Sequence, residues 1–303
     1  MDTAIIGAVF VDVKGFAFEH YSPTGTNIGA VQFVHGGVCR NVCEDFGNQG
    51  VKASFVSMTD HSALGREVRE RLEGLGVDLR HTLFAEDGMG MWLAILDEHG
   101  DLVGSVSKQP DFRPLEAYLR AHGEEIVSAA ENVILEIDMN ESIAETVLEL
   151  AEKHGKPVYA IVGNMGVILR RPEFLRHVRV FICNEIEAGR LFGADLTQNT
   201  PFEMLDALIA GAKRAGIRSM VITMGEKGAV YFDGDSGEAG HCPAVPAEMV
   251  DSTGAGDAFF AGTVMALNLG RSLRQAVAVG ARLASATLRC KESSCAKVEG
   301  LFD

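Results

Sequence analysis

The chain has 303 residues, of which 47% are hydrophobic, so it can bury a sizeable core as one large α/β domain or as two smaller ones. Its 27 basic and 42 acidic residues give a formal net charge of −15, which argues against the phosphate backbone of RNA or DNA as a partner. No apolar run is long enough to span a bilayer and no secretory leader precedes the first strand-like residues, so we expect a cytoplasmic protein with reduced cysteines.

Strand-like and helix-like segments alternate along the chain. Apolar runs predict strands at residues 4–11, 54–58, 133–137, 158–162, 178–183, 220–224 and 245–250. Helical patterns lie at 64–72, 142–153, 185–192 and 202–215, and two last helices at about 256–269 and 273–288. Such alternation predicts a mainly parallel sheet that helices cover on both faces.

Two stretches interrupt this alternation. Residues 11–34 contain short strand-like pieces, and residues 90–106 alternate in strand fashion around a polar turn at 97–101. Strands that lack covering helices tend to form a small sheet of their own. Because the chain contains neither a low-complexity linker nor an internal repeat, we expect a single domain over residues 1–303. Its lid would consist of residues of about 12–35 and 88–108.

Residues 251–259 read Asp-Ser-Thr-Gly-Ala-Gly-Asp-Ala-Phe. The glycines precede a predicted helix, whose first backbone N–H groups and positive dipole end form an anion site. Asp257 follows directly, and a carboxylate beside a bound phosphate can accept a proton during phosphoryl transfer. The helix dipole alone also favours an acid in the first turn, but that explains one acid and not two acids with two glycines.

Residues 36–42, Gly-Gly-Val-Cys-Arg-Asn-Val, form a second glycine-rich pattern at the start of a predicted helix. In this order, the two segments resemble the signature motifs of the ribokinase-like (PfkB) carbohydrate and nucleoside kinases. The resemblance covers essentially the whole chain. It implies the family's α/β three-layer sandwich, with a mainly parallel central sheet and a small β-lid.

The resemblance also implies roles for individual residues. Asp257 would be the general base that accepts the proton of the substrate hydroxyl, and the amides of Gly254, Ala255 and Gly256 would stabilise the transferring phosphoryl group. The implied substrate contacts are Asp12, Gly36, Gly37, Asn41 and Glu136. An ordinary turn residue at a strand end is an open alternative for Asp12.

Two further segments resemble the nucleotide side of the family. Asn184 and Glu187 match an Asn-x-x-Glu motif that is implied to organise Mg²⁺ and phosphates through water, although the same pattern fits a helix capping box. Residues 223–228 resemble the turn beside ATP, where a glycine-rich hairpin turn is the alternative. The implied ATP contacts are Asn184, Thr223, Gly225 and Gly228. Asp251 resembles a residue near a monovalent cation, K⁺, in some relatives.

The implied activity is ATP-dependent phosphorylation of the primary 5′-hydroxyl of a ribose-containing nucleoside. Val38 and Arg40 resemble the pseudouridine kinase subgroup, whereas Gly163 stands where that subgroup tends to have proline. The alternatives are the same chemistry on a free sugar (ribose, fructose or a keto-deoxy sugar acid) and a catalytically silent nucleotide or sugar sensor. We expect a small-molecule substrate, no nucleic-acid or membrane partner, and a homodimer formed through the lid.

Overall fold

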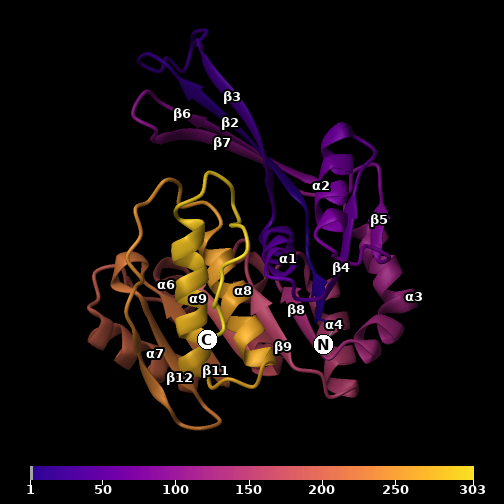
Figure 1. Ribbon diagram of the computed structural model, residues 1–303, viewed down its shortest axis with the longest axis vertical. Helices are drawn as coiled ribbons and strands as arrows, with labels where there is room; N and C mark the ends of the chain where they lie inside the picture. The colour runs from indigo at the N-terminus through magenta and orange to yellow at the C-terminus, as the bar shows by residue number, and fades with distance from the viewer. Residues whose placement is uncertain (1–2) are drawn as a thin grey trace.

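The computed structural model describes residues 3–303, and within them the strands form two sheets (Figure 1). The larger sheet has the order β13-β12-β11-β10-β9-β8-β1-β4-β5. From β5 to β11 its neighbouring strands run parallel, and β12 and β13 add an antiparallel edge. The bounds are β1 Thr3–Ile6, β4 Ala53–Thr59, β5 Thr82–Phe84, β8 Asn132–Glu136, β9 Val158–Ile161, β10 Val180–Asn184, β11 Ser219–Thr223, β12 Ala229–Asp233 and β13 Ala239–Cys242.

Helices cover both faces of this sheet. Successive strand residues point to opposite sides, so both faces carry apolar side chains that a layer of helices must cover. Ile5 of β1 belongs to one core, whereas Ala4 and Ile6 belong to the other. The first core includes α1 Val38–Asn48, α2 Ala63–Gly74, α8 Ala255–Asn268 and α9 Leu273–Thr287. The second includes α3 Arg113–Ala129, α4 Glu141–Lys153, α5 Gly166–Arg170, α6 Glu185–Phe192 and α7 Pro201–Ala215. The predicted three-layer α/β architecture is therefore confirmed.

The second sheet lies above the carboxyl ends of the main strands, at the top of Figure 1. Its order is β3-β2-β6-β7, from β2 Phe10–Ala17, β3 Gly29–Gly36, β6 Gly90–Leu96 and β7 Leu102–Lys108. Only the β2–β6 pair is parallel. These strands come from the two stretches that interrupt the alternation in the sequence, and we call this sheet the lid.

Two strand predictions are wrong. The run at residues 4–11 is not one strand, because β1 ends at Ile6 and the chain crosses into the lid at Phe10. A Cβ on Gly7 would lie 2.2 Å from the Cβ of Cys39, so this crossing is tightly packed. Residues 245–250 form no strand, and most of them line a cavity instead. Helix α3 was not predicted, although Leu115 and Leu119 have helical spacing.

The six cysteines are free thiols, and Cys39 and Cys43 are buried in α1. Burial raises the pKa of both thiols well above its usual value, so both are protonated and unreactive at neutral pH.

Among residues 3–303, no cluster of His, Cys, Asp and Glu side chains could by itself hold a metal ion. In the same residues, no helix has both the length and the apolar character that a membrane crossing needs.

Candidate active site

A cavity of about 980 Å³ lies between the lid and the carboxyl edge of the main sheet. One cross-strand row of the lid lines it: Asp12 on β2 is opposite Trp92 on β6, which is opposite Ser107 on β7. Side chains directly opposite one another share a face, so all three point into the cavity. Glu136 and Asp138, at the end of β8, line the opposite wall. We call this space the substrate cavity.

Gly36 and Gly37 allow the lid, the first strand and α1 to meet closely beside Asp12. A Cβ on Gly36 would lie 2.8 Å from Oδ1 of Asp12. Gly37 has a φ of +98°, and its Cβ would lie 2.5 Å from the carbonyl oxygen of Ala8. Burial raises the pKa of Asp12, although the positive charge of Lys14 opposes this shift. The structure thus brings Asp12 and the glycine pair together, and their contact with substrate stays a prediction.

Glu136 and Asp138 are buried carboxyl groups in the wall of the substrate cavity opposite the lid. Ala8 N–H donates to Oε2 of Glu136 at 2.9 Å, and Asn164 N–H donates to Oδ2 of Asp138 at 2.8 Å. Burial raises the pKa of Glu136 to about 8 and that of Asp138 to about 6. Glu136 is therefore mostly protonated at neutral pH and can donate a hydrogen bond to a substrate oxygen. Asp138 was not predicted, because no motif marks it and its one signal in the sequence is its position just beyond the same strand.

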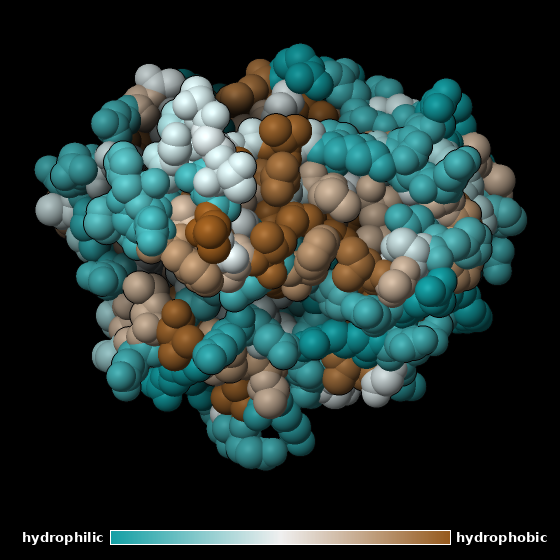
Figure 2. Space-filling view, turned by 90° about the horizontal axis from the view of Figure 1, so that it is seen from above, coloured by the Kyte–Doolittle hydropathy of each residue, from teal (hydrophilic) through white to brown (hydrophobic). Residues whose placement is uncertain are grey.

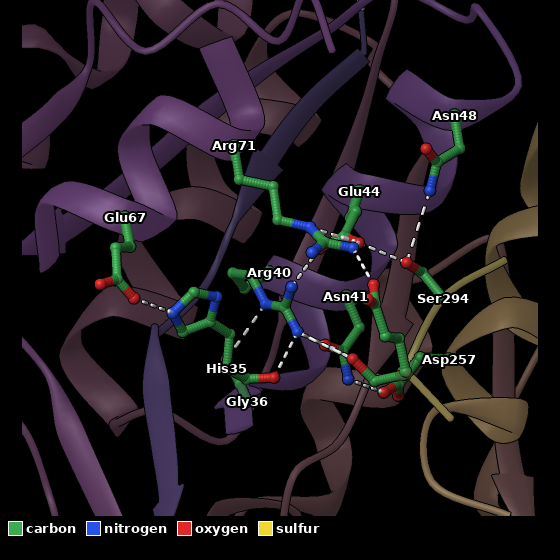
Figure 3. Close-up of polar contacts among 12 residues, drawn as sticks. His35, Gly36, Arg40, Asn41, Glu44, Asn48, Glu67, Arg71, Asp257 and Ser294 are labelled. Carbon is green, nitrogen blue, oxygen red and sulfur yellow. Dashed lines mark hydrogen bonds and ion pairs between the residues drawn. The ribbon is translucent and has the colours of Figure 1, made fainter. Parts of the chain in front are cut away.

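Asp257 joins the two glycine-rich motifs. Asn41 Nδ2 donates to Oδ2 of Asp257 at 2.6 Å (Figure 3). Gly254, with a φ of +81°, begins α8 without a side-chain cap. The N–H of Ala255 donates to the carbonyl oxygen of Ser252 at 3.3 Å, so within the described residues the amides of Gly254 and Gly256 remain for a ligand. Burial raises the pKa of Asp257 to about 7, whereas the hydrogen bond from Asn41 and the charge of Arg40 lower it. A pKa near neutrality suits a group that must accept a proton.

A second cavity, of about 560 Å³, adjoins the start of α8 and is called the nucleotide cavity below. Ala255 and Gly256 line it together with the predicted ATP contacts Thr223, Gly225 and Gly228. Its remaining wall is mainly apolar and comes from the segment 244–249 and from α9. This wall was not predicted, because the apolar run at residues 245–250 resembles a strand.

Asn184 and Glu187 form the capping box of α6, so the structural alternative for this motif is correct. Oδ1 of Asn184 accepts from the N–H of Glu187 at 2.9 Å, and Oε2 of Glu187 accepts from the N–H of Asn184 at 2.8 Å. Burial raises the pKa of Glu187, and its charge raises the pKa of Asp257. The box uses Oε2 of Glu187, and carboxylate oxygens are groups that hydrated Mg²⁺ accepts, so the chemistry of Glu187 fits the water-mediated role that the resemblance implies. That role stays a prediction.

Lys14 links the lid to the motif at 251–257. It lies two residues after Asp12 on the same face of β2, and its Nζ donates to Oγ1 of Thr253 at 3.3 Å. Oδ1 of Asp251 accepts from the N–H of Thr253 at 2.8 Å, and the charge of Lys14 helps to lower the pKa of Asp251. No local pattern marks Lys14 in the sequence, because its partner is 239 residues away.

The nucleotide cavity adjoins the glycine turn at the start of α8, and the substrate cavity adjoins the glycine turn at the start of α1. Asp257, a carboxylate of near-neutral pKa, connects the two helices through its hydrogen bond with Asn41. This arrangement is typical of a phosphotransferase, which must bind a phosphoryl group and remove a proton from the acceptor. The model of the pfkB family carbohydrate kinases matches residues 2–298, and the chain belongs to this family. Its members transfer a phosphoryl group to a hydroxyl group of a sugar or nucleoside.

Relatives match this chain along almost its whole length. Guanosine-inosine kinase of Exiguobacterium acetylicum is 33% identical over 291 residues, which cover 96% of this chain and 95% of the relative. Pseudouridine kinase of Escherichia coli (strain K12) is 25% identical over 289 residues, or 95% and 90% of the two chains. The structure of Arabidopsis thaliana ribokinase complexed with ribose and ATP has a TM-score of 0.83 at 22% identity, covering 97% and 95%. The chain is thus a nucleoside or sugar kinase with the ribokinase fold, and the predictions of family, fold and enzyme class are confirmed.

Proposed function

We propose that this protein is an ATP-dependent kinase that phosphorylates the 5′-hydroxyl of a ribonucleoside. The observation that carries this proposal is the size and lining of the substrate cavity. Its volume of about 980 Å³ is at the upper end of ordinary ligand pockets, about 300–1,000 Å³. A free pentose would leave most of that space to water. Phe10, Trp92 and Phe112 offer aromatic surface on which a nucleobase can pack.

The arrangement of carboxylates supports the following mechanism. Asp12 accepts hydrogen bonds from the two vicinal ribose hydroxyls, which directs the primary hydroxyl toward Asp257. Oδ1 of Asp257 accepts the proton while the hydroxyl oxygen forms a bond to the γ-phosphorus of ATP. The bond from that phosphorus to the bridging oxygen breaks, and ADP leaves. The amides at the start of α8 hold the phosphoryl oxygens throughout.

Mg²⁺ and ATP bind together in this proposal. ATP occupies the nucleotide cavity, with its base against the apolar wall and its phosphates at the start of α8. Mg²⁺, when bound, neutralises phosphate charge, and Glu187 and Asn184 would hold it through its water shell. Nζ of Lys14 bonds Thr253, two residues after Asp251, and so brings a positive charge to this segment. We therefore expect K⁺ to be of secondary importance here.

Among nucleosides, we favour guanosine or inosine over pseudouridine. The relative that phosphorylates purine nucleosides, as its name states, is more similar to this chain than the pseudouridine kinase, at 33% against 25% identity over nearly equal lengths. Two side-chain amides that can hydrogen-bond a base edge line the substrate cavity: Gln109 and Asn164. Pseudouridine remains the second candidate, since the same amides can bind its uracil ring.

Measurement of ADP release tests this proposal. We expect ADP release with Mg·ATP and guanosine or inosine, and little release with ribose or fructose. Pseudouridine and uridine are assayed as further acceptors. Each assay is run in K⁺ and in Na⁺. Release with a free sugar alone would overturn the nucleoside proposal while leaving the kinase chemistry intact. ATP binding by calorimetry without release on any acceptor would instead support the silent sensor.

Trp92→Ala should raise the KM for the nucleoside, because the indole is the largest aromatic surface of the substrate cavity. Base stacking on an aromatic side chain contributes about 1–3 kcal/mol, so we expect KM to rise about 5- to 150-fold. The matched control is Met91→Ala, since Met91 precedes Trp92 on β6 and is 41% exposed outside the cavity. Equal KM values for the two variants would contradict base stacking on Trp92.

We also propose that the protein forms a homodimer through the lid. The face of the lid opposite Asp12 carries an apolar cross-strand row, Phe33, Val13, Leu93 and Val106, in which Phe33 and Val106 are 60% and 67% exposed. Apolar side chains gather on the surface seen from above in Figure 2. Exposed apolar patches of this kind mark association surfaces.

Sedimentation equilibrium tests the dimer. We expect twice the mass of the 32.4 kDa chain at micromolar concentration, and a shift toward the monomer in Val106→Lys. Phe202→Lys is the control, because Phe202 on α7 is also exposed, at 75%, and is remote from the lid. A monomeric wild-type protein, or equal masses for both variants, would contradict association through the lid.

A further inference from the structure

Arg40 is a buried guanidinium beside the contact between Asn41 and Asp257 (Figure 3). Its side chain is 3% exposed and forms an ion pair with Glu44, one turn further along α1. Arg71 of α2 donates to the same carboxylate at 2.8 Å. A buried guanidinium is costly unless it is paired and hydrogen-bonded, and Glu44 meets this need. The ion pair with Glu44 compensates the buried charge of Arg40 but uses only Nη1 of its three nitrogens.

The remaining donors of Arg40 point toward the active site. Nη2 donates to the carbonyl oxygen of His35 at 2.5 Å, and Nε donates to that of Gly36 at 3.4 Å. These two residues end β3 and lead into the glycine turn beside Asp12. Through these two hydrogen bonds, Arg40 holds the backbone of that turn in place.

Nη2 of Arg40 also donates to Oδ1 of Asn41. The two ends of an asparagine amide are nearly equal in size, so its neighbours decide which end faces which way. A guanidinium can only donate, and Ser293 Oγ donates to the same oxygen at 3.1 Å. The oxygen of Asn41 must therefore face Arg40, and its NH₂ group must face Asp257.

We propose that Arg40 is a positioning residue for phosphoryl transfer, which fixes the amide of Asn41 so that its NH₂ group holds one oxygen of Asp257 and leaves the other for the substrate hydroxyl. This inference rests on the proposed function, in which Asp257 is the base. Nη2 of Arg40 also donates to Oγ of Ser293 at 2.9 Å, which directs the hydroxyl proton of Ser293 to the oxygen of Asn41. Without Arg40 that hydroxyl can donate or accept, so the amide can rotate and turn its oxygen toward the carboxylate. The repulsion between the two oxygens would then displace Asp257 and favour its protonated form.

Charged groups from several elements surround Asp257, and most are acidic. Its pKa is lowered by Arg40 of α1 and raised by Glu187 of α6 and Asp12 of β2. Asp257 in turn raises the pKa of Asp45 of α1 and Glu136 of β8, so these acids also face it. Arg40 supplies the positive charge that opposes them. Loss of Arg40 should therefore move the acid limb of the kcat/KM profile to higher pH, because the base must be deprotonated to act.

The test compares Arg40→Met, Asn41→Ala and the double variant in kcat and in the pH profile. A displacement of about 1 Å can cost about 100-fold in rate, so we expect Arg40→Met to lower kcat by about 10- to 100-fold and to shift the acid limb upward. If Arg40 acts through Asn41, Arg40→Met should cost little more in the Asn41→Ala background. Independent effects that multiply, with the acid limb unchanged, would reduce Arg40 to a structural role and overturn the proposal.

Two further variants separate positioning from folding. Arg71→Met removes the outer partner of Glu44 but touches neither Asn41 nor Asp257, so we expect a lower Tm and an unmoved acid limb. Arg40→Lys keeps the positive charge but loses the planar guanidinium fork, which bonds Asn41 and the backbone at the same time. We therefore expect kcat to stay low, whereas the acid limb of the kcat/KM profile should return toward that of the wild type. Wild-type kinetics for Arg40→Lys would contradict the role of the fork.

A readout without turnover keeps this inference distinct from the proposed function. The ionisation of Asp257 can be followed by carbon-13 NMR of its carboxyl group in the wild type and in Arg40→Met or Arg40→Lys. We expect a higher pKa for Asp257 in Arg40→Met even if no nucleoside in the panel is a substrate. An unchanged titration would overturn the inference, whereas absence of ADP release in the wild type would overturn only the proposed function.

Discussion

Replacement of Asp257 with asparagine is expected to lower kcat by about 10²- to 10⁴-fold, the range that a positioned general base contributes. Asparagine has the same shape and can still accept the hydrogen bond from Asn41, but it cannot take up the proton of the substrate hydroxyl. The measurement is ADP release at saturating Mg·ATP and nucleoside. Nucleotide affinity, measured by calorimetry, should change little because the nucleotide cavity stays intact.

The pH profile makes this prediction specific to Asp257. Since its pKa is raised to about 7, kcat/KM of the wild type should rise with pH up to about 7 and then level off. The residual activity of Asp257→Asn should lack this limb. Glu136→Gln is the control, because Glu136 is also buried with a raised pKa, of about 8, and its loss should leave the limb in place. A limb that disappears in Glu136→Gln and persists in Asp257→Asn would make Glu136 the base.

The second large effect is expected for Gly254→Ala. Gly254 has a φ of +81°, and a Cβ there would lie 2.0 Å from the carbonyl oxygen and 2.6 Å from the carbonyl carbon of Ser293. The carbonyl group of Ser293 is part of the backbone and cannot rotate away as the end of a side chain can. Either the turn at Gly254 or the backbone at Ser293 must therefore move. Loss of one oriented amide donor costs about 10²–10³ in kcat. We expect at least that loss, with a Tm several degrees lower, since left-handed strain alone costs about 1–2 kcal/mol.

Gly256→Ala is the matched control for the stability of this turn. A Cβ on Gly256 meets no heavy atom within 4 Å, and its φ is not positive. Because Gly256 lies in the first turn of α8, alanine should leave the Tm unchanged or raise it slightly. Differential scanning fluorimetry of both variants gives the comparison. Equal Tm values for Gly254→Ala and Gly256→Ala would show that the close approach to Ser293 is unimportant.

Local patterns in the sequence determined the class of fold and the centre of the site. Strand–helix alternation predicts parallel pairing because connections through helices leave few other arrangements. The run at 251–259 predicts a helix start with an anion site and a neighbouring acid, since glycine, acid and helix are all close in sequence. Asn184 and Glu187 likewise predict a capping box, which the structure confirms in full.

Only the tertiary structure decided which distant residues meet. The hydrogen bond between Asn41 and Asp257 joins positions 216 residues apart, and that between Lys14 and Thr253 joins positions 239 residues apart. Periodicity reports contacts within a few residues, whereas these pairs depend on how the lid, α1 and α8 pack. For the same reason hydrophobicity alone misassigned residues 4–11 and 245–250: an apolar run indicates burial, but the packing decides whether it forms a strand, a crossing between sheets or the wall of a cavity.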